Sequence, residues 1–263
     1  MAKTAKSNKI DVIEQLVSNN YLFKGLDKDW LKQTLPAASL KVEKLFSNRP
    51  IYTAFLPEES IEVLYIILDE GIVISRSAPL DRIISIAYPG SCFGERNLPF
   101  SYGLATKAFP TLVEAYKTTH AIKLPLATVE QIYQENESFR DRYRLLFELQ
   151  EKFQYHLLNC SAYPPQAVAS LLRALIYQER ELGNQPNSEG IYTFDLPVDI
   201  IARACQLNQR TVEQVLKGMQ KVGLIELAKG SDLSSDIIRV IAPENLKEVY
   251  AATRDKVAWW PLR

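Results

Sequence analysis

Polar side chains between positions 208 and 221 have the types and spacing to hydrogen-bond the edges of nucleic-acid bases. The stretch NQRTVEQVLKGMQK places Gln209, Arg210 and Gln214 on the polar side of one predicted helix, after Asn208. Asparagine is a favourable N-cap, so the helix is expected to begin directly after it. Arginine suits guanine and glutamine suits adenine, each good pair contributing about 1–3 kcal/mol of discrimination. This chemistry is recognition rather than catalysis.

Two predicted helices position those side chains. The pattern indicates a short helix from 198 to 204, a turn over 205–208 and a second helix from 209 to about 220, the layout of a helix-turn-helix. Small and apolar residues allow the two helices to pack across each other: Ala202, Val212, Val215 and Met219. The turn often carries glycine where this chain has Gln206, so we expect Gln206 to adopt a left-handed conformation at some energetic cost.

The surroundings of this helix pair favour contact with a duplex. The stretch KVGLIELAKGSDLSSDIIRVI reads as a two-stranded hairpin, or wing, with Lys229 at its tip. Arg203, Lys217 and Lys221 are placed to meet phosphates, which give affinity rather than sequence preference. From 160 to 263 the 12 Lys and Arg balance 12 Asp and Glu, so non-specific DNA affinity should be weak. The alternative is an ordinary helical hairpin with a solvated polar face.

A second pattern, PGSCFGERNLPFSYGLATKAFP at 89–110, has most of the residues of a cyclic-nucleotide pocket. Gly94 and Glu95 are followed at the appropriate distance by Ala105 and Thr106, where an Arg-Ser or Arg-Thr pair would hold the cyclic phosphate. A buried phosphate without a cation is costly, and arginine is the usual partner. Lys107 follows Thr106 on a strand and should point to the opposite face. The stretch therefore predicts a pocket for a less acidic ligand, or for none.

Residue composition changes along the chain, and these changes predict the elements that carry the two patterns. Short helices are expected over 10–36, with Asp27 as an N-cap, and short strands over 40–124, rich in Val, Ile, Tyr and Thr and separated by Pro and Gly. A long helix without Gly or Pro follows from 129 to 160 and ends at a proline hinge, Tyr163-Pro164-Pro165. The fold class is α+β, with a boundary near 160–165.

The long helix carries a heptad pattern. Its apolar residues recur in alternating steps of four and three, with one polar member, and the seam comprises Phe139, Tyr143, Leu146, Gln150, Phe153, Leu157 and Cys160. This spacing is typical of a two-stranded coiled coil and predicts a parallel homodimer. The alternative is one amphipathic helix covering its own sheet domain. Arg140, Arg142 and Arg144 are expected to spread around the helix as a solvated charged face.

Several function classes are disfavoured. The chain has 263 residues and equal numbers of acidic and basic side chains, no run of 18 apolar residues, and an N-terminus without the apolar core of a secretion signal. Three separated cysteines and two histidines give no metal-ligand spacing and fit a reducing cytoplasm. We find no nucleophile–base set and no glycine-rich phosphate loop, so an enzyme is not expected. Cys92 is either a packing residue or a redox-sensitive thiol.

The order of these elements resembles the Crp–Fnr family of bacterial transcription regulators. The similarity covers residues 20–242, and its most specific pieces are ESIEVLYIILDEGIVIS, PGSCFGE and LNQRTVEQVLKGMQKVGLIEL. It implies an effector domain with an antiparallel β-barrel (1–127), a dimerisation helix (128–162) and a winged helix-turn-helix (163–242). A helical extension (243–263), containing Trp259 and Trp260, goes beyond the usual end of the family.

The resemblance also implies roles for residues. The three base contacts of the family fall on Gln209, Arg210 and Gln214, and its ribose-binding pair falls on Gly94 and Glu95. Ala105-Thr106 matches only half of the phosphate pair, and Glu151 and Lys152 stand at the adenine-contact positions. Cyclic AMP is therefore not expected as the ligand. No cysteine precedes Cys92 and no histidine precedes His120, which disfavours an iron–sulfur cluster and a haem.

These observations together predict a homodimeric, cytoplasmic, sequence-specific DNA-binding regulator. Its expected partners are a palindromic duplex and a second copy of itself, with RNA polymerase a further candidate and no membrane. No cofactor or metal is expected, and the small-molecule effector is not specified by the sequence. The alternative function is a ligand-binding or protein-interaction module that no longer reads DNA, which the neutral charge of 160–263 and the acidic Glu213 both favour.

Overall fold

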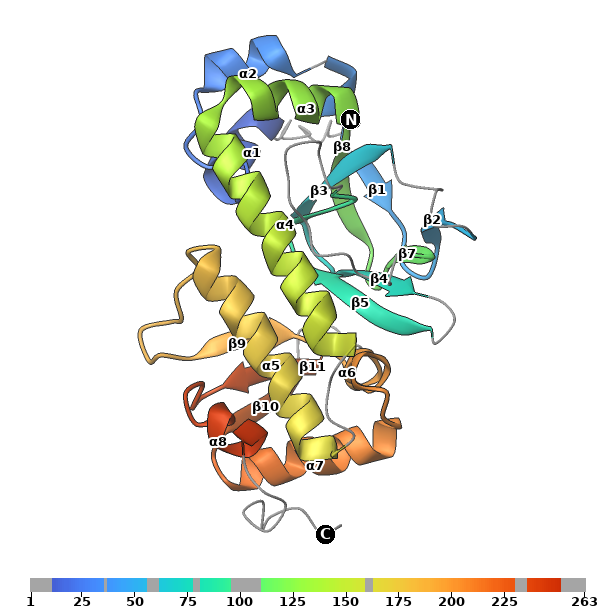
Figure 1. Cartoon of the computed structure of the whole chain (residues 1–263), viewed down its shortest axis with the longest axis vertical. Helices are drawn as coiled ribbons and strands as arrows, with labels where there is room; N and C mark the ends of the chain where they lie inside the picture. Colours follow the sequence, from blue (N-terminus) through green and yellow to red (C-terminus); the bar gives the residue numbers. More distant parts are fainter. Residues whose placement is uncertain are drawn as a thin grey trace, which may run out of the picture.

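The structure, a computed structural model, describes residues 11–35, 37–55, 62–77, 81–95, 110–158, 163–229 and 236–251 (Figure 1). The helices are α1 (Val12–Asn19), α2 (Lys28–Thr34), the short 3₁₀ helix η1 (Ala37–Leu40), α3 (Leu126–Glu135), α4 (Glu137–Leu158), α5 (Pro164–Glu181), α6 (Val198–Cys205), α7 (Gln209–Lys221) and α8 (Leu246–Ala251). The strands are β1 (Glu43–Leu45), β2 (Pro50–Thr53), β3 (Val63–Asp69), β4 (Val73–Ser77), β5 (Arg82–Ala87), β6 (Cys92–Phe93), β7 (Leu112–Ala115), β8 (Thr119–Pro125), β9 (Tyr192–Asp195), β10 (Ile225–Lys229) and β11 (Asp236–Val240).

The part before α4 contains the predicted short helices and strands. Asp11 and Asp27 cap α1 and α2, and the strands form two antiparallel four-stranded sheets, ordered β1-β8-β3-β6 and β2-β7-β4-β5. Gly71 joins β3 to β4 at φ 78°, and a Cβ there would lie 2.8 Å from the carbonyl oxygen of Lys117. The turn therefore requires glycine. The α+β class with antiparallel sheets is confirmed.

The predicted long helix is in fact two helices. α3 ends at Glu135, and Asn136 begins a new helix because its side-chain oxygen accepts a hydrogen bond from the backbone N–H of Phe139 at 2.9 Å. Asparagine in this position satisfies a backbone donor that has no partner within the helix. α4 then runs as one continuous helix from the end bearing α1–α3 to the end bearing α5–α8 (Figure 1).

The heptad stripe of α4 is covered by the chain itself in this structure, whereas the sequence predicts that it faces a partner helix. Its apolar members are at most 4% exposed: Phe139, Tyr143, Leu146, Phe153 and Leu157. The first three pack with the N-terminal helices, where the rings of Phe23 and Phe139 lie 5.2 Å apart. The last two pack in the core that α5–α8 share. Gln150 contacts the sheet part, and Cys160 lies outside the described residues.

The part after α4 begins with two prolines in the first turn of α5, where proline needs no backbone donor. The three-stranded antiparallel sheet β10-β11-β9 follows the expected strand and hairpin, and the wing tip from 230 to 235 lies outside the described residues. α8 packs on α5 through Leu246 and Val249, both buried. Trp259 and Trp260 lie outside the described residues as well.

One apolar core joins the two parts. Ile74 of β4 and Ile83 and Ile86 of β5 belong to the same cluster of buried side chains as the apolar faces of α5, α6 and α7. The sheet part therefore does not stand apart from the C-terminal part but packs directly against it. Within the described ranges, no helix has the length and apolarity to cross a membrane.

Candidate functional site

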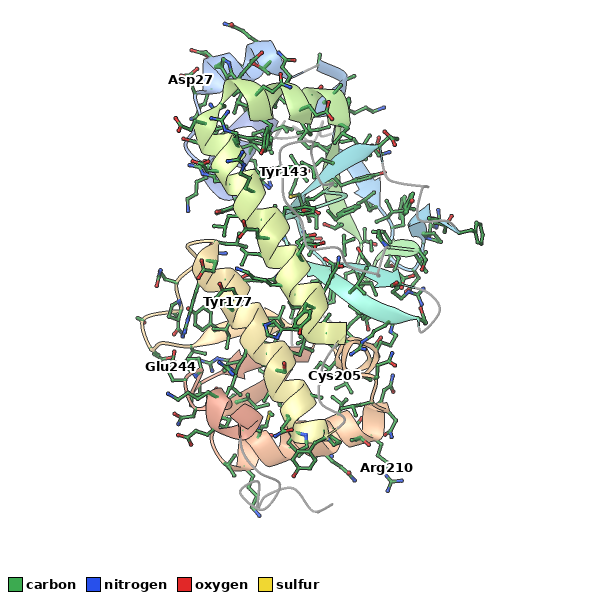
Figure 2. The ribbon with its side chains drawn as sticks, viewed as in Figure 1. Asp27, Tyr143, Tyr177, Cys205, Arg210 and Glu244 are labelled. Carbon is green, nitrogen blue, oxygen red and sulfur yellow. The ribbon has the colours of Figure 1, made fainter. Side chains whose placement is uncertain are left out.

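α7 presents the predicted base-reading side chains to solvent. Gln209, Arg210 and Gln214 are exposed on one face, and Lys217 and Lys221 continue that face toward the end of the helix. Figure 2 shows Arg210 projecting away from the body of the molecule. The opposite face is buried through Val212, Val215, Leu216 and Met219. This separation leaves a polar helix surface that no other described element covers.

The turn before α7 has the geometry that the sequence predicts. Asn208 caps the helix, and its side-chain oxygen accepts from the backbone N–H of Thr211 at 2.8 Å. Gln206 has φ 56° and ψ 39°, the left-handed conformation that glycine adopts more readily. The turn directs the N-terminal end of α7 outward, because α6 packs across its buried face.

Charge on the exposed face of α7 is net positive although the C-terminal part as a whole is neutral. Arg210, Lys217 and Lys221 outnumber Glu213, and all four side chains are exposed. Two acidic groups elsewhere in the C-terminal part pair with other cations: Glu244 with Arg180 at 2.6 Å, and Glu226 with Arg239 at 2.7 Å. The positive charge needed for phosphate contact is thus concentrated locally.

Arg203, which the sequence predicts as a phosphate contact, pairs with carboxylates within the protein in this structure. Its guanidinium lies 3.7 Å from a Glu114 carboxylate oxygen on β7 and 3.1 Å from Asp199 on α6, and the side chain is 30% exposed. Glu114 also lies 3.4 Å from Arg76. Arg203 is therefore on the face of α6 that packs on the sheet part.

Arg203 belongs to a set of polar contacts between the two parts, which we call the docking network. Its members are Glu114, Tyr116 and Lys117 from the sheet part, and Asp195, Asp199 and Arg203 from the C-terminal part. The hydroxyl of Tyr116 donates to Asp199 at 2.8 Å, and the ammonium of Lys117 pairs with Asp195. Tyr88 adds a hydrogen bond from its hydroxyl to the backbone carbonyl of Asp195 at 3.2 Å. These bonds fix the orientation of α6, and therefore of α7, relative to the sheets.

The predicted effector pocket is described only in part. Gly94 follows β6 with φ 89°, and Glu95 comes next, partly buried. The thiol of Cys92 donates to Glu95 at 2.9 Å, and the Gln150 side chain on α4 also hydrogen-bonds Glu95. Ala105 and Thr106 lie outside the described residues. Glu95 therefore links the Gly-Glu turn to α4.

Burial controls the ionisation of this pair. It raises the pKa of Glu95 to about 7, against the opposing effect of the hydrogen bonds from Cys92 and Gln150. Burial, together with the neighbouring Glu95, raises the pKa of the Cys92 thiol well above its usual range. A buried thiol of raised pKa is a poor nucleophile, which favours the packing interpretation of Cys92.

Gln150 also lines a hollow between the two parts. The hollow is bounded by the β5–β6 connection at Tyr88 and Gly90, by α4 at Gln150, and by α5 at Gln178 and Glu179. Burial raises the pKa of Glu179, and Asn184 donates to its carboxylate at 2.8 Å. This hollow was not predicted from the sequence, because its walls come from three distant segments. Among the described residues, no group of His, Cys, Asp and Glu could hold a metal ion.

Comparison with solved structures identifies the class of fold. FixK2 from Bradyrhizobium japonicum aligns with a TM-score of 0.57 at 16% identity, covering 81% of this chain and 98% of that chain. A CooA mutant from Carboxydothermus hydrogenoformans aligns with a TM-score of 0.54 at 17% identity, covering 80% and 87%. No protein-family model and no curated protein matches the sequence.

Both of these structures are Crp–Fnr transcription regulators, so the chain has the fold of that class. The resemblance predicted from the order of the elements is confirmed at the level of the fold. The alignments span nearly the whole of FixK2 and most of CooA, so the sheet part, α4 and the C-terminal part are all included in the likeness.

Proposed function

We propose that this protein is a Crp–Fnr-type transcription regulator that binds DNA sequence-specifically as a homodimer and does not depend on cyclic AMP. The observation that carries the proposal is the exposed face of α7. It combines Gln209, Arg210 and Gln214 near the N-terminus of the helix with the cations Lys217 and Lys221 further along. A helix of this kind enters the major groove in regulators with a helix-turn-helix.

In this proposal each part of the chain has one role. Residues 1–127 form an effector domain with a β-barrel, 128–162 form the connecting and dimerising helices, 163–242 form a winged helix-turn-helix, and 243–263 form an extension. The two copies bind a palindromic site, with half-sites one helical turn apart. RNA polymerase is a further partner, and the site of action is the bacterial cytoplasm.

In the arrangement that the structure shows, the apolar stripe of α4 is buried within one chain and is not available for a dimer contact. A partner helix could reach Phe139 or Leu157 only if the parts that cover them moved away from α4. The face of α4 that remains open is mostly polar and carries the exposed ring of Tyr155. Sedimentation of the purified chain over a range of concentrations measures whether two copies associate.

Two sets of contacts are the proposed means by which the sheet part influences the position of α7. The first runs from Glu95 through Gln150 to α4, and the second runs through the docking network to α6. A ligand changes the position of α7 only if it binds one arrangement of these contacts more tightly than another. The proposed effector is a ligand less acidic than a cyclic nucleotide, because Ala105 stands at the position of the phosphate-binding arginine.

Selection of bound sequences from random duplex DNA tests the proposal, using the purified full chain without added ligand. A recovered palindrome supports a regulator that is competent without an effector. If no sequence is enriched, the selection is repeated with metabolites from a cell extract. Failure of both selections, with protein that is folded by circular dichroism, would contradict DNA reading.

A second candidate function rests on Glu213. This carboxylate is exposed within the proposed reading face, where its negative charge would repel the phosphates of a duplex. It favours a module that retains the fold and binds a ligand or protein instead of DNA. The salt dependence of duplex binding separates the two functions, because phosphate contacts make affinity fall steeply with salt. Affinity that is independent of salt would favour the second function.

A further inference from the structure

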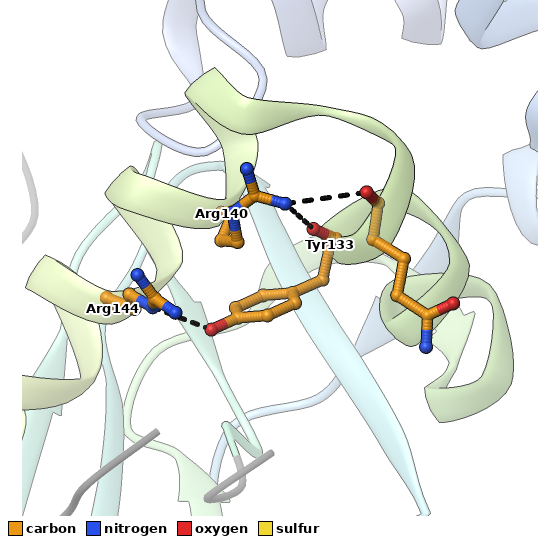
Figure 3. A pocket seen from close by; sticks show the side chains of 4 residues that line it. Tyr133, Arg140 and Arg144 are labelled. Atoms are coloured by element: carbon orange, nitrogen blue, oxygen red, sulfur yellow. Dashed lines mark hydrogen bonds between the residues drawn. The ribbon is translucent and has the colours of Figure 1, made fainter. Parts of the chain in front are cut away.

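Two arginines of α4 lie beside one hollow. The hollow is at the end of α4 that carries the sheet part, far from α7 (Figure 1). The hollow has a volume of about 300 Å³ and is lined by Tyr133, Gln134, Arg140 and Arg144 (Figure 3). It lies at the elbow where α3 meets α4. Arg142, expected to belong to the same charged face, points elsewhere and donates to the backbone carbonyls of Leu22 and Lys24.

The protein holds both guanidinium groups in place while leaving part of each without a partner. Arg144 Nε donates to the hydroxyl of Tyr133 at 2.8 Å, and its guanidinium lies 5.8 Å from the centre of that ring. Arg140 Nη1 lies 3.4 Å from the carbonyl oxygens of Tyr133 and Gln134, in the last turn of α3. In the described part of the chain, no contact occupies Arg140 Nη2 or either Nη of Arg144, and no carboxylate pairs with the two arginines.

The two arginines carry like charges close together on one helix. Residues four apart on a helix are neighbours, and two like charges at this spacing repel each other. Tyr133 is only 1% exposed, so its ring and hydroxyl give Arg144 a partner whose position is fixed by packing. Guanidinium groups bind carboxylates and phosphates through paired hydrogen bonds, and donors held in advance lose less freedom on binding.

We propose that the α3–α4 elbow is a binding site for a small dianion, a phosphate group or a compact dicarboxylate, held between Arg140 and Arg144. Two guanidinium groups balance two negative charges. The hollow is open at the surface and large enough for a group of that size. The site is separate from the Gly-Glu turn at Gly94 and does not depend on DNA binding.

Isothermal titration calorimetry of the full chain at pH 8 and low ionic strength tests the site. Inorganic phosphate and malonate are titrated separately, with acetate as the monoanion. We expect phosphate or malonate to bind with a dissociation constant near or below about 1 mM, and acetate at least about tenfold more weakly. Binding of phosphate alone or malonate alone identifies which dianion the site prefers. The proposal is wrong if neither dianion binds, or if acetate binds equally well.

Two variants remove one positive charge each from the same helix. Arg144→Ala should weaken dianion binding at least about tenfold, because a charge-assisted pair of hydrogen bonds is lost. Arg142→Ala should leave it within about twofold, because that guanidinium faces α1 and its following turn. Equal losses in both variants would show general attraction to positive charge and would overturn the site.

A third variant separates the effect of charge from that of the planar guanidinium, and a second measurement tests for self-association. Arg144→Lys keeps the charge but loses the planar fork, so its affinity should lie between those of Arg144→Ala and the unmodified chain. Sedimentation velocity then tests whether these arginines hold a second copy of the chain instead. The proposal is overturned if Arg144→Ala changes the association state and leaves dianion binding unchanged.

Discussion

Arg210 and Lys217 lie on the same exposed face of α7 but are expected to contact different parts of a duplex. Arg210→Ala should relax the sequence preference at one base pair in each half-site, by about 1–3 kcal/mol, because a bidentate contact to a base edge is lost. Lys217→Ala should instead weaken binding to all sequences similarly and reduce the slope of log affinity against log salt by about one.

Fluorescence anisotropy with the selected duplex and its single-base variants, over a series of salt concentrations, measures both effects. The two variants control for each other, since each removes one cation from the same helix. A uniform loss of affinity for Arg210→Ala would show that Arg210 contacts phosphate and reads no base.

Glu95 should make stability depend on pH. Burial raises its pKa from 4.5 to about 7, so the folded protein keeps a proton that the unfolded chain has lost across this window. Stability then falls as pH rises from about 4.5 to 7, because the folded state binds more protons than the unfolded state there. Glu95→Gln removes this ionisation and should raise the melting temperature at pH 8 more than at pH 5. A difference between the two proteins that is constant with pH would contradict the raised pKa.

At the residue scale, the sequence predicted those features that depend only on neighbouring residues, such as helix caps and turn conformations. Asn208 as a cap and Gln206 in a left-handed conformation follow from the backbone needs of two adjacent residues, and the structure has both. Arg203 could not be placed in this way, because its partner Glu114 is on a strand far away in the sequence. The same holds for Gln150, whose partner Glu95 is also far away in the sequence.

At the element scale, the turn between α6 and α7 stores backbone strain at Gln206. A left-handed conformation is unfavourable for residues with a Cβ by about 1–2 kcal/mol, and glycine avoids this cost. Gln206→Gly should therefore be more stable than Gln206→Ala by about 1 kcal/mol in urea unfolding. The alanine variant is the matched control, since both lose the same side-chain contacts. Equal stability would show that the turn relaxes to another conformation.

The heptad spacing of α4 illustrates what periodicity can and cannot establish. The steps of four and three correctly identify a helix with one apolar stripe. They do not identify what covers the stripe, because the side chains need only to be removed from water. Here Phe139 and Leu157 are covered by opposite ends of the same chain rather than by a partner helix. The break at Asn136, by contrast, had a signal in the sequence, an N-cap residue within QENESF.

At the scale of the whole molecule, the docking network should contribute to the stability of the complete chain. Tyr116→Phe removes the hydroxyl that bonds Asp199 and leaves a partly buried carboxylate with one donor fewer. We expect a loss of about 1 kcal/mol in the free energy of unfolding. Tyr177→Phe is the control, because Tyr177 is 43% exposed on α5, and its effect should stay within about 0.5 kcal/mol. Calorimetry should show a single transition shifted as a whole, whereas two separate transitions would contradict a shared core.

For the whole chain, the sequence predicted the order of the domains and elements but not how they pack against one another. Residue composition and periodicity located the strands, the long helical segment and the final helix pair. The fold shared with the solved structures agrees with that order. The direct packing of β4 and β5 on α6 had no signal, since buried isoleucines look alike whichever surface covers them. The hollow that Arg140 and Arg144 line beside Tyr133 likewise depends on the elbow between two helices, which was not predicted from the sequence.

The core that joins β4 and β5 to α5–α7 limits the modularity of the protein. A C-terminal part cut out at residue 163 would expose to water the surface of α6 that packs against β5, and would leave Asp195 and Asp199 without Lys117 and Tyr116. Joining this C-terminal part to a different N-terminal domain would therefore require a new surface that matches both its apolar face and its two carboxylates. For the same reason, substitutions in β5 and α6 are expected to accumulate in compensating pairs as such a sequence diverges.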